Sequence, residues 1–436
     1  MCGIFASQLP GETQEMLARM KHRGPDAQSS VYAGGFSVGL ARLAIVAVDA
    51  PEATQPYVST QGRIIAFNGE IYNYKALDDR AASEVELLAR MLDEHCDPRQ
   101  FIDGEYAILY YNPSQRTVTL YRDRFGICPL YYQLRPHVAI SSERRRLERP
   151  IDVPAHGKVL IDLDTRNVIE LDRILHYGVT IEKTPGHENR NVFQALFEQA
   201  VASRASHTDA GFSMVLSGGL DSSAIAYGLR YHRRPREAIC VTLDVDSGDA
   251  RHARMVADDL KLDLKVIKVS RDELHADAPA ILQHLDGHTV EITPLKWRAS
   301  VRNWYAAKAC TTKVLLCGEG ADELFEGYPP HTYSLRPMYR LAQRQLTAIR
   351  SLPAINLDRT NKLGLAHSKE YRCPFLASTL SYWLLSQQPR PPKELLRDYL
   401  RRHHAPQSLI DRPKWGDDEV ALDKTWSEIN AANPAT

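Results

Sequence analysis

The stretch Ser217-Gly218-Gly219-Leu220-Asp221-Ser222-Ser223 lies between the apolar run GFSMVL (211–216) and the helix-like run SAIAYGLRY (223–231). Glycines at the end of a strand let the backbone approach an anion closely, and the N-terminus of the following helix offers unpaired N–H groups and positive partial charge. The stretch therefore predicts a phosphate-binding loop, although it lacks the Gly-Lys-Ser/Thr ending of a Walker A loop. The alternative is a glycine-rich turn with a serine cap.

The chain around this loop alternates between predicted strands and predicted helices. The strands are predicted at 211–216, 238–246, 264–270 and 313–320, and the helices at 223–231 and 249–261. Such alternation is typical of a doubly wound parallel sheet, whose ligands bind beyond the carboxyl ends of the strands. The last strand runs into a second loop, GEGADE (318–323), at the same edge. Beyond about residue 335 we expect mostly helix.

The two loops bring carboxylates to this edge. Asp221 in the first loop and Asp322 in the second are candidate ligands of a divalent metal ion, because hard oxygen ligands together with nucleotide phosphates are the usual site of Mg²⁺. Phosphate, metal and carboxylates together indicate nucleotidyl or phosphoryl chemistry. The alternative is that Asp322 and Glu323 only cap the following helix.

The first 175 residues have a different pattern, with short β-rich segments and few helices. The strands are predicted at 3–9, 36–46, 62–70, 106–112, 117–123, 129–134 and 137–143. Helices are predicted only near 12–21 and 83–95. This pattern predicts an α+β layered domain of antiparallel strands. The polar stretch 180–191 is the predicted linker, which gives two domains at 2–180 and 190–436.

Bulk composition excludes several classes of function. A length of 436 residues is too great for one core, and a formal net charge of zero gives no general attraction to nucleic acid or to a membrane surface. No apolar run is long enough to span a bilayer, and no signal peptide is recognisable. The seven cysteines include no Cys-x-x-Cys pair, which predicts reduced thiols and a cytoplasmic protein.

The chain begins MCGIF, with a cysteine directly after the initiator methionine. Cysteine is small enough for the methionine to be removed, and removal would leave Cys2 with a thiol and a free α-amine. These two groups form a self-contained nucleophile and base. The alternative is a buried cysteine that packs as a small hydrophobic residue.

Several motifs together resemble a known family. SGGLDSS and GEGADELFEGY (318–328) are similar to the synthetase domain of the asparagine synthetase family, whose ATP site is of the pyrophosphatase-loop type. The first half resembles the class II glutamine amidotransferases, whose domain is a four-layer sandwich of the N-terminal-nucleophile type. Further matching stretches are KHRGPD (21–26), RLAIV (42–46), FNGEIYNY (67–74), YRDRFGICPLYY (121–132), DRTNKLGLAHSKEYRCPFL (358–376) and DRPK (411–414).

The resemblance implies a glutaminase site in the first half. Cys2 would attack the side-chain amide of glutamine, with its own α-amine as the base. Asn68 and Gly69 match the positions of the oxyanion hole. Arg42 matches the arginine that binds the glutamine carboxylate, and Glu70 matches a residue that helps to bind the α-amine.

In the second half the resemblance implies an ATP-dependent carbon–nitrogen ligase that uses glutamine as its nitrogen donor. The acceptor carboxylate is adenylated, pyrophosphate leaves, and ammonia that travels through the protein interior displaces AMP. Asp221 and Asp322 match the Mg²⁺ ligands, Glu319 matches a group that takes a proton from ammonia, and Lys414 matches a lysine that neutralises charge. The implied ATP-binding residues are Leu216, Ser217, Gly218, Gly219, Asp221, Ser222 and Gly318.

The match departs from the family at several positions. Glu84 stands where the family has an aspartate that pairs with the glutamine α-amine, and Leu40, Ala47 and Ala377 replace further family residues. The family's acceptor motif is not recognisable in DGHTVEITPLKWRAS (286–300), where Lys296 or Arg298 are substitutes by type only. The acceptor is therefore aspartate or a related biosynthetic carboxylic acid.

Other functions stay open at this point. One is an adenylating ligase of the β-lactam synthetase kind, which needs no working glutaminase, and another is a non-catalytic family member. The expected partners are glutamine and a small carboxylic acid, with neither nucleic acid nor membrane. The basic stretches ERRRLER (143–149) and RYHRRPRE (230–237) are interpreted as solvated surface. Formation of a homodimer is left open.

Overall fold

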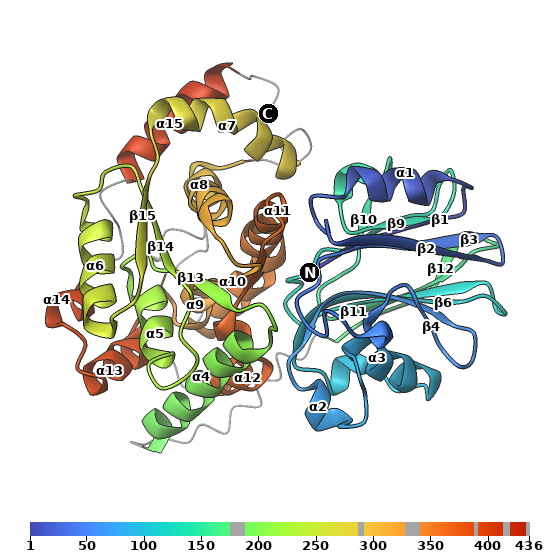
Figure 1. Ribbon diagram of the computed structural model, residues 1–436, viewed down its shortest axis with the longest axis horizontal. Coiled ribbons are helices and arrows are strands. Elements are labelled where there is room, and N and C mark those ends of the chain that lie inside the picture. Colours follow the sequence, from blue (N-terminus) through green and yellow to red (C-terminus); the bar gives the residue numbers. More distant parts are fainter. Residues whose placement is uncertain (175–187, 287–291, 328–340, 388–390, 413–418, 433–436) are drawn as a thin grey trace. The chain divides into compact units, whose positions relative to one another are not determined.

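The computed structural model describes residues 1–174, 188–286, 292–327, 341–387, 391–412 and 419–432 (Figure 1). The chain divides into two compact units. Unit 1 consists of Met1–Leu175 and Leu365–Ser368, and unit 2 consists of His176–Gly364 and Lys369–Thr436. Among the helices in the described parts of the chain, none has the length and apolar composition needed to cross a bilayer.

Unit 1 contains two six-stranded antiparallel sheets. The first has the order β10-β8-β9-β1-β3-β2, with β1 Gly3–Ser7, β2 Ala27–Ala33, β3 Phe36–Arg42, β8 Tyr131–Gln133, β9 Ala139–Ser141 and β10 Ile151–Asp152. The second has the order β12-β11-β7-β6-β5-β4, with β4 Tyr57–Val58, β5 Ile64–Ile71, β6 Gly104–Asn112, β7 Thr117–Arg122, β11 Gly157–Asp162 and β12 Asn167–Arg173.

Helices cover the outer faces of these sheets (Figure 1). Helix α1 (Glu12–Arg19) packs on β1 and β3, and α3 (Glu84–Asp93) packs on β5. A short helix, α2 (Tyr74–Leu77), precedes α3. Strands β1 and β3 in turn contact β5 of the other sheet. The result is a four-layer helix–sheet–sheet–helix sandwich, which confirms the predicted architecture of this half.

Unit 2 contains a five-stranded parallel sheet with the order β15-β14-β13-β16-β17. Its strands are β13 Phe212–Val215, β14 Ala238–Thr242, β15 Leu264–Lys268, β16 Val314–Leu316 and β17 Glu370–Arg372. Helices α6 (Gly248–Leu260) and α8 (Pro294–Ala309) pack on β14 from opposite faces (Figure 1). The predicted doubly wound sheet is therefore confirmed. Strand β17 lies in the part that was predicted as mostly helical, and it forms because its three residues pair with β16.

The other elements of unit 2 are helices. Their bounds are α4 Glu188–Ser206, α5 Leu220–Gly228, α6 Gly248–Leu260, α7 Arg271–His284, α8 Pro294–Ala309, α9 Ala321–Leu324, α10 Leu341–Leu352, α11 Asp358–Leu365, α12 Ser378–Ser386, α13 Glu394–Arg402, α14 Gln407–Ile410 and α15 Glu419–Ala432. Most of the predicted linker (180–191) lies outside the described residues. Its last residues, from Glu188, belong to α4.

The strand order of unit 2 reverses between β13 and β16. From β13 the chain continues to β14 and β15 on one side, whereas β16 and β17 lie on the other side. Adjacent loops at such a reversal leave a crevice beyond the carboxyl ends of the strands. The loop after β13 and the loop after β16 are SGG (217–219) and CGEG (317–320), so the fold brings both candidate loops to the same place.

Candidate active sites

Unit 1 has a small cavity of about 40 Å³ between β3, β5 and the start of α3. Five of the predicted glutaminase residues line it, namely Cys2, Arg42, Gly69, Glu70 and Glu84. They come from segments far apart in the sequence, so the fold and not sequence proximity brings them together. All five carry groups that can bind or attack a small polar molecule.

The backbone of Cys2 is joined to the sixth predicted residue, Asn68. Cys2 lies directly before β1, and its backbone N–H donates to Asn68 Oδ1 at 2.5 Å. Asn68 is fully buried in β5, and its Nδ2 has no hydrogen-bond partner among the described residues. An unpaired buried donor is costly unless a ligand or intermediate uses it. The side-chain oxygen of Asn68 thus binds the backbone of Cys2, while its Nδ2 is left as a donor for a ligand or an intermediate.

Met1 fills part of the same cavity. Only 2% of its surface is exposed, and its Sδ accepts a hydrogen bond from Cys128 Sγ at 3.5 Å. With Met1 in place the nitrogen of Cys2 is a peptide nitrogen, which is not basic. A space of about 40 Å³ holds only a few water molecules. Removal of Met1 would enlarge the cavity and turn the nitrogen of Cys2 into an amine.

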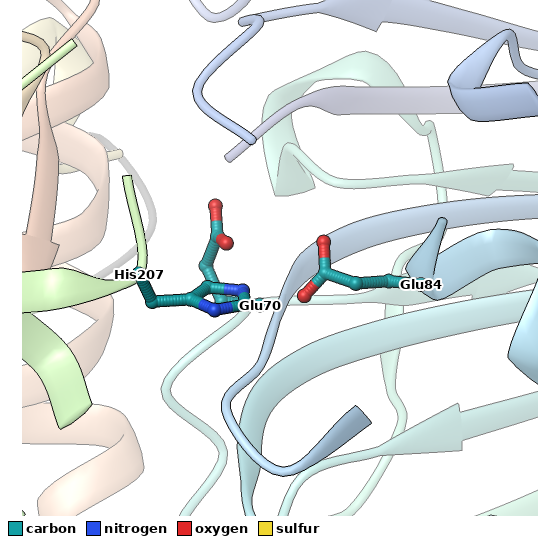
Figure 2. A group of neighbouring side chains, drawn as sticks. All are labelled: Glu70, Glu84 and His207. Atoms are coloured by element: carbon teal, nitrogen blue, oxygen red, sulfur yellow. The ribbon is translucent and has the colours of Figure 1, made fainter. Parts of the chain in front are cut away.

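The cavity wall carries charges of both signs, a positive one from Arg42 and negative ones from Glu70 and Glu84. The guanidinium of Arg42 donates to the carbonyl of Ala47 at 3.1 Å, and it forms no ion pair with a carboxylate in the described part of unit 1. Carboxylate oxygens of Glu70 and Glu84 lie within 4.8 Å of each other. Figure 2 draws the two side chains. Glu84 also accepts the backbone N–H of Ile71. The wall therefore presents a cation and a pair of carboxylates, which suit the two charged ends of an α-amino acid.

Gly69 allows the backbone to run close to β6 beside the cavity. Its φ is +142°, and a Cβ at this position would lie 1.9 Å from the carbonyl oxygen of Glu105. No side chain can be accommodated there without movement of the strand. The glycine that was predicted as an oxyanion-hole residue thus has a clear local structural requirement.

Unit 2 has a larger cavity of about 390 Å³ at the strand-order reversal. The predicted residues that line it are Ser217, Gly219, Asp221, Glu319 and Asp322. Four other predicted residues lie in or next to the two loops but do not line the cavity, namely Leu216, Gly218, Ser222 and Gly318. Of these, Ser222 accepts the backbone N–H of Ser217 with its Oγ at 3.1 Å. Lys414 lies outside the described residues.

The first loop has the geometry expected of an anion cradle. Gly218 has a φ of +72°, and a Cβ there would lie 2.4 Å from the carbonyl oxygen of Asp249. Gly219 caps α5, a nine-residue helix whose N-terminus faces the cavity edge. The guanidinium of Arg412, which also lines the cavity, donates to the carbonyl of Gly218 at 2.7 Å. These features favour phosphate binding at this loop.

The two carboxylates predicted as metal ligands share one cation. The Nζ of Lys393 lies 2.7 Å from Asp221 Oδ2 and 2.7 Å from Asp322 Oδ1. Burial alone would lower the pKa of Lys393, but the charges of Asp221 and Asp322 outweigh it and raise the pKa. This lysine was not among the predicted site residues. In the stretch RPPKELL nothing marks it, because its partners are 172 and 71 residues away along the chain.

The predicted proton acceptor, Glu319, is also held by a cation. Its Oε1 accepts from Arg359 Nη2 at 2.7 Å and from the hydroxyl of Thr360 at 3.3 Å. Arg359 is 2% exposed and is bonded to Asn303 as well. Arg359 lies within DRTNK, one of the stretches on which the resemblance rests, but no role had been predicted for it. The ion pair keeps Glu319 oriented into the cavity wall.

Comparison with known proteins finds a different family in each half of the chain. Residues 1–188 match the family described as "Glutamine amidotransferase domain", and residues 192–348 match the family described as "Asparagine synthase". A protein of Rattus norvegicus named "Asparagine synthetase (glutamine-hydrolyzing)" is 27% identical over 98% of this chain and 86% of its own length. "Asparagine synthetase (glutamine-hydrolyzing) 2" of Oryza sativa subsp. japonica is 28% identical over 86% and 68%. Among solved structures, the glutamine phosphoribosylpyrophosphate amidotransferase from B. subtilis has a TM-score of 0.34 at 15% identity, over 61% of this chain and 65% of its own.

Proposed function

Since the chain is an asparagine synthetase-like glutamine amidotransferase with an ATP-utilising synthetase domain, we propose that Cys2 releases ammonia from glutamine and that the second domain transfers it to an adenylated carboxylic acid. The observation that carries this proposal is the first cavity. A cysteine, an arginine and two carboxylates line it, and the cysteine is bonded to a buried amide that has an unused donor.

In the glutaminase step, the thiol of Cys2 attacks the side-chain amide carbon of glutamine. The α-amine freed by removal of Met1 takes the thiol proton and gives it to the leaving ammonia. The Nδ2 of Asn68 and the backbone N–H of Gly69 stabilise the oxyanion. Arg42 binds the α-carboxylate, while Glu70 and Glu84 bind the α-ammonium group. Water then hydrolyses the thioester to glutamate.

In the synthetase step, the loop Ser217–Ser223 binds the phosphates of ATP. An acceptor carboxylate oxygen attacks the α-phosphorus, and pyrophosphate leaves. Ammonia then attacks the acyl carbon, AMP leaves, and Glu319 takes the proton from the new amide nitrogen. Lys414 is proposed to neutralise charge in this step. The acceptor is aspartate or a related small acid.

Asp221 and Asp322 fit a Mg²⁺ ion, because both already contact one shared cation, Lys393. The metal would supply positive charge to the phosphates of ATP. Asp221 and Asp322 themselves hold the ends of the two loops together through their shared contact with Lys393. We also propose a glutaminase domain at 2–180 and a synthetase domain at 190–436. We propose that the enzyme is cytoplasmic, because none of its seven cysteines is in a disulfide. The proposed reaction requires neither a membrane nor a homodimer.

The test compares Cys2→Ala with wild type in two assays. With glutamine as the nitrogen source, the variant is expected to release no AMP above background with any acceptor. With ammonium chloride, it is expected to match wild type, since the second site is untouched. Cys96→Ala is the control, because Cys96 is partly exposed and lies outside the cavity. Full glutamine-dependent activity in Cys2→Ala would overturn the assignment.

A further inference from the structure

Two cysteines of unit 2 face each other where neighbouring strands of the parallel sheet end. Cys317 follows β16, and Cys373 follows β17. The two strands pair in register, with Leu316 opposite Arg372. The backbone N–H of Cys317 also donates to the carbonyl of Arg372 at 3.0 Å. Because each cysteine is the next residue after this pair, the two side chains lie side by side.

The two thiols are already in van der Waals contact. Their sulfur atoms lie 3.7 Å apart, and neither cysteine is in a disulfide. Adjacent strands are about 4.8 Å apart, which is within the Cα separation of about 4.4–6.8 Å found in disulfides. A sulfur–sulfur bond of about 2.05 Å therefore requires rotation of the side chains and a small shift of the loops, while the sheet stays paired.

Burial limits the oxidants that can reach this pair. Cys317 is 4% exposed and Cys373 is 1% exposed. A disulfide reagent or another protein is too large to reach such thiols, whereas hydrogen peroxide is only slightly larger than water. Cys317 is the more exposed of the two, and Glu319, two residues further along, lines the cavity of about 390 Å³. We therefore assign the first reaction to Cys317.

We infer that Cys317 and Cys373 form a reversible disulfide in the presence of hydrogen peroxide, and that this bond lowers the activity of the synthetase site. The thiol of Cys317 attacks one oxygen of the peroxide, water leaves, and a sulfenic acid forms. The thiol of Cys373 then attacks this sulfur, and a second water leaves. The two thiols lose two electrons, one peroxide is reduced to two waters, and a dithiol reductant restores the thiols.

The disulfide acts on the loop CGEG (317–320). Cys317 is its first residue, and a Cβ on Gly320, its last, would lie 2.4 Å from Leu376 Cδ2. Leu376 lies three residues after Cys373, so the segment that follows β17 already packs against this loop. A bond between the sulfurs therefore shifts the loop relative to this segment.

The same loop carries part of the proposed synthetase site, so the effect on activity rests on the proposed function. Glu319 is bonded to Arg359 at 2.7 Å. Asp322, in the first turn of α9, is bonded to Lys393 at 2.7 Å. A misplacement of about 1 Å in groups that bind or react with a substrate lowers a rate by about 10²-fold. Oxidation of the cysteine pair is therefore expected to slow AMP release, and reduction to restore it.

The experiment treats the full chain with hydrogen peroxide and identifies the disulfide by mass spectrometry of its peptides. AMP release is measured with L-aspartate, ATP, Mg²⁺ and ammonium chloride, since peroxide also oxidises Cys2 and glutamine then cannot supply the nitrogen. As the disulfide forms, kcat of wild type is expected to fall by about 10- to 100-fold, and dithiothreitol is expected to restore it. Calorimetry is expected to show weaker binding of ATP with Mg²⁺ to the oxidised form.

Two variants remove one thiol each. Cys317→Ala and Cys373→Ala form no disulfide at this place, so both are expected to keep their AMP release in peroxide. Cys240→Ala is the matched control, because Cys240 is fully buried in β14 of the same sheet, and it is expected to be inactivated like wild type. Thermal unfolding checks that each variant is folded.

Three outcomes would overturn the inference. Oxidised wild type without a peptide that joins Cys317 to Cys373 has no such modification site. A disulfide that forms while AMP release and ATP binding stay unchanged does not regulate the synthetase site. Inactivation of Cys317→Ala that dithiothreitol reverses assigns the effect to another cysteine. The proposed function fails separately, when reduced wild type releases no AMP with any acid, and mass spectrometry and calorimetry then still decide the role of the pair.

Discussion

The Nζ of Lys393 lies 2.7 Å from a carboxylate oxygen of Asp322 and 2.7 Å from one of Asp221, so a single ammonium group joins the first turns of α9 and α5, the helices that follow β16 and β13. Lys393 has a φ of +57°, a conformation that few non-glycine residues adopt. Its backbone N–H donates to the carbonyl of Phe325 at 3.0 Å. The two acids are therefore already arranged around a positive charge before any ligand binds.

The first prediction concerns this cation. Lys393→Met leaves two adjacent carboxylates without their counter-charge, which is expected to lower the free energy of unfolding by about 3 kcal/mol. Because Lys393 then no longer competes with a divalent ion for the two carboxylates, Mg²⁺ is expected to restore part of the loss, and Mn²⁺ is expected to bind more tightly than to wild type. Urea unfolding with and without Mg²⁺, and Mn²⁺ titration, measure both effects.

Lys261→Met is the control for Lys393→Met, because Lys261 also has a positive φ, of +54°, but is exposed at the end of α6. A Lys393→Met protein that Mg²⁺ stabilises no more than wild type would show that Asp221 and Asp322 do not share a divalent ion.

The second prediction concerns the unused donor of Asn68. Asn68→Ala is expected to lower kcat for glutamine hydrolysis by about 10²- to 10³-fold, the usual effect of losing one oxyanion-hole donor. AMP release with ammonium chloride is expected to stay unchanged. Asn73→Ala is the control, since its side chain bonds to the carbonyl of Phe101 outside the cavity. Equal losses in both assays would indicate a folding defect instead.

The third prediction concerns the pair of carboxylates in Figure 2. Glu84→Gln keeps the shape of the side chain but removes its charge, so the α-ammonium group of glutamine loses one partner. KM for glutamine is expected to rise by about 10-fold, with a smaller change in kcat. Glu86→Gln, on the same helix, removes a charge that pairs with Arg90, and its KM is expected to match wild type. The prediction is wrong if the two variants have the same KM.

The fourth prediction concerns acid stability. Burial alone would raise the pKa of Glu143, but the hydrogen bond from His22 at 2.7 Å and the charges of His22, Arg145 and Arg23 hold it well below the usual 4.5. A carboxyl group with a lowered pKa stabilises the folded state above about pH 4.5, and this contribution is lost as the pH falls through the folded-state pKa.

Glu143→Gln is therefore expected to lower the free energy of unfolding at neutral pH by about 1–3 kcal/mol and to flatten its decline at acid pH. Urea midpoints between about pH 6 and pH 3 measure the slope. Glu148→Gln, an exposed position in the same segment, is expected to follow wild type. A variant with the wild-type slope would show that Glu143 does not contribute to acid unfolding.

Local signals were sufficient for much of the fold. The loop Ser217–Ser223 was predicted because strand, glycines and helix are contiguous in the sequence, and α3 because its apolar residues have helical spacing. The strands that were not predicted in unit 1 are β2, β4, β10, β11 and β12. Of these, β2 and β12 lie at sheet edges, where exposed faces blur the alternation. Strand β17 is only three residues long and forms by pairing with β16, whose residues lie 56 positions earlier in the chain.

The same contrast applies to the candidate sites. Cys2 and Asp221 lie in motifs that are recognisable in a few residues. Lys393 has no such context, because its significance depends on which charges surround it after folding. The type of a lysine is visible in the sequence, whereas the presence or absence of a nearby carboxylate is a property of the tertiary structure.

The division of the chain into units has a practical consequence for anyone who wishes to study one activity alone. Leu365–Ser368 belongs to unit 1 although it is flanked on both sides by unit 2, and Ser368 donates to the carbonyl of His22 at 2.7 Å. A fragment that stops near residue 180 would lack this tetrapeptide, and one that starts near residue 190 would carry it without the strands it belongs to. No single cut of the polypeptide therefore gives two fragments that each contain one whole unit.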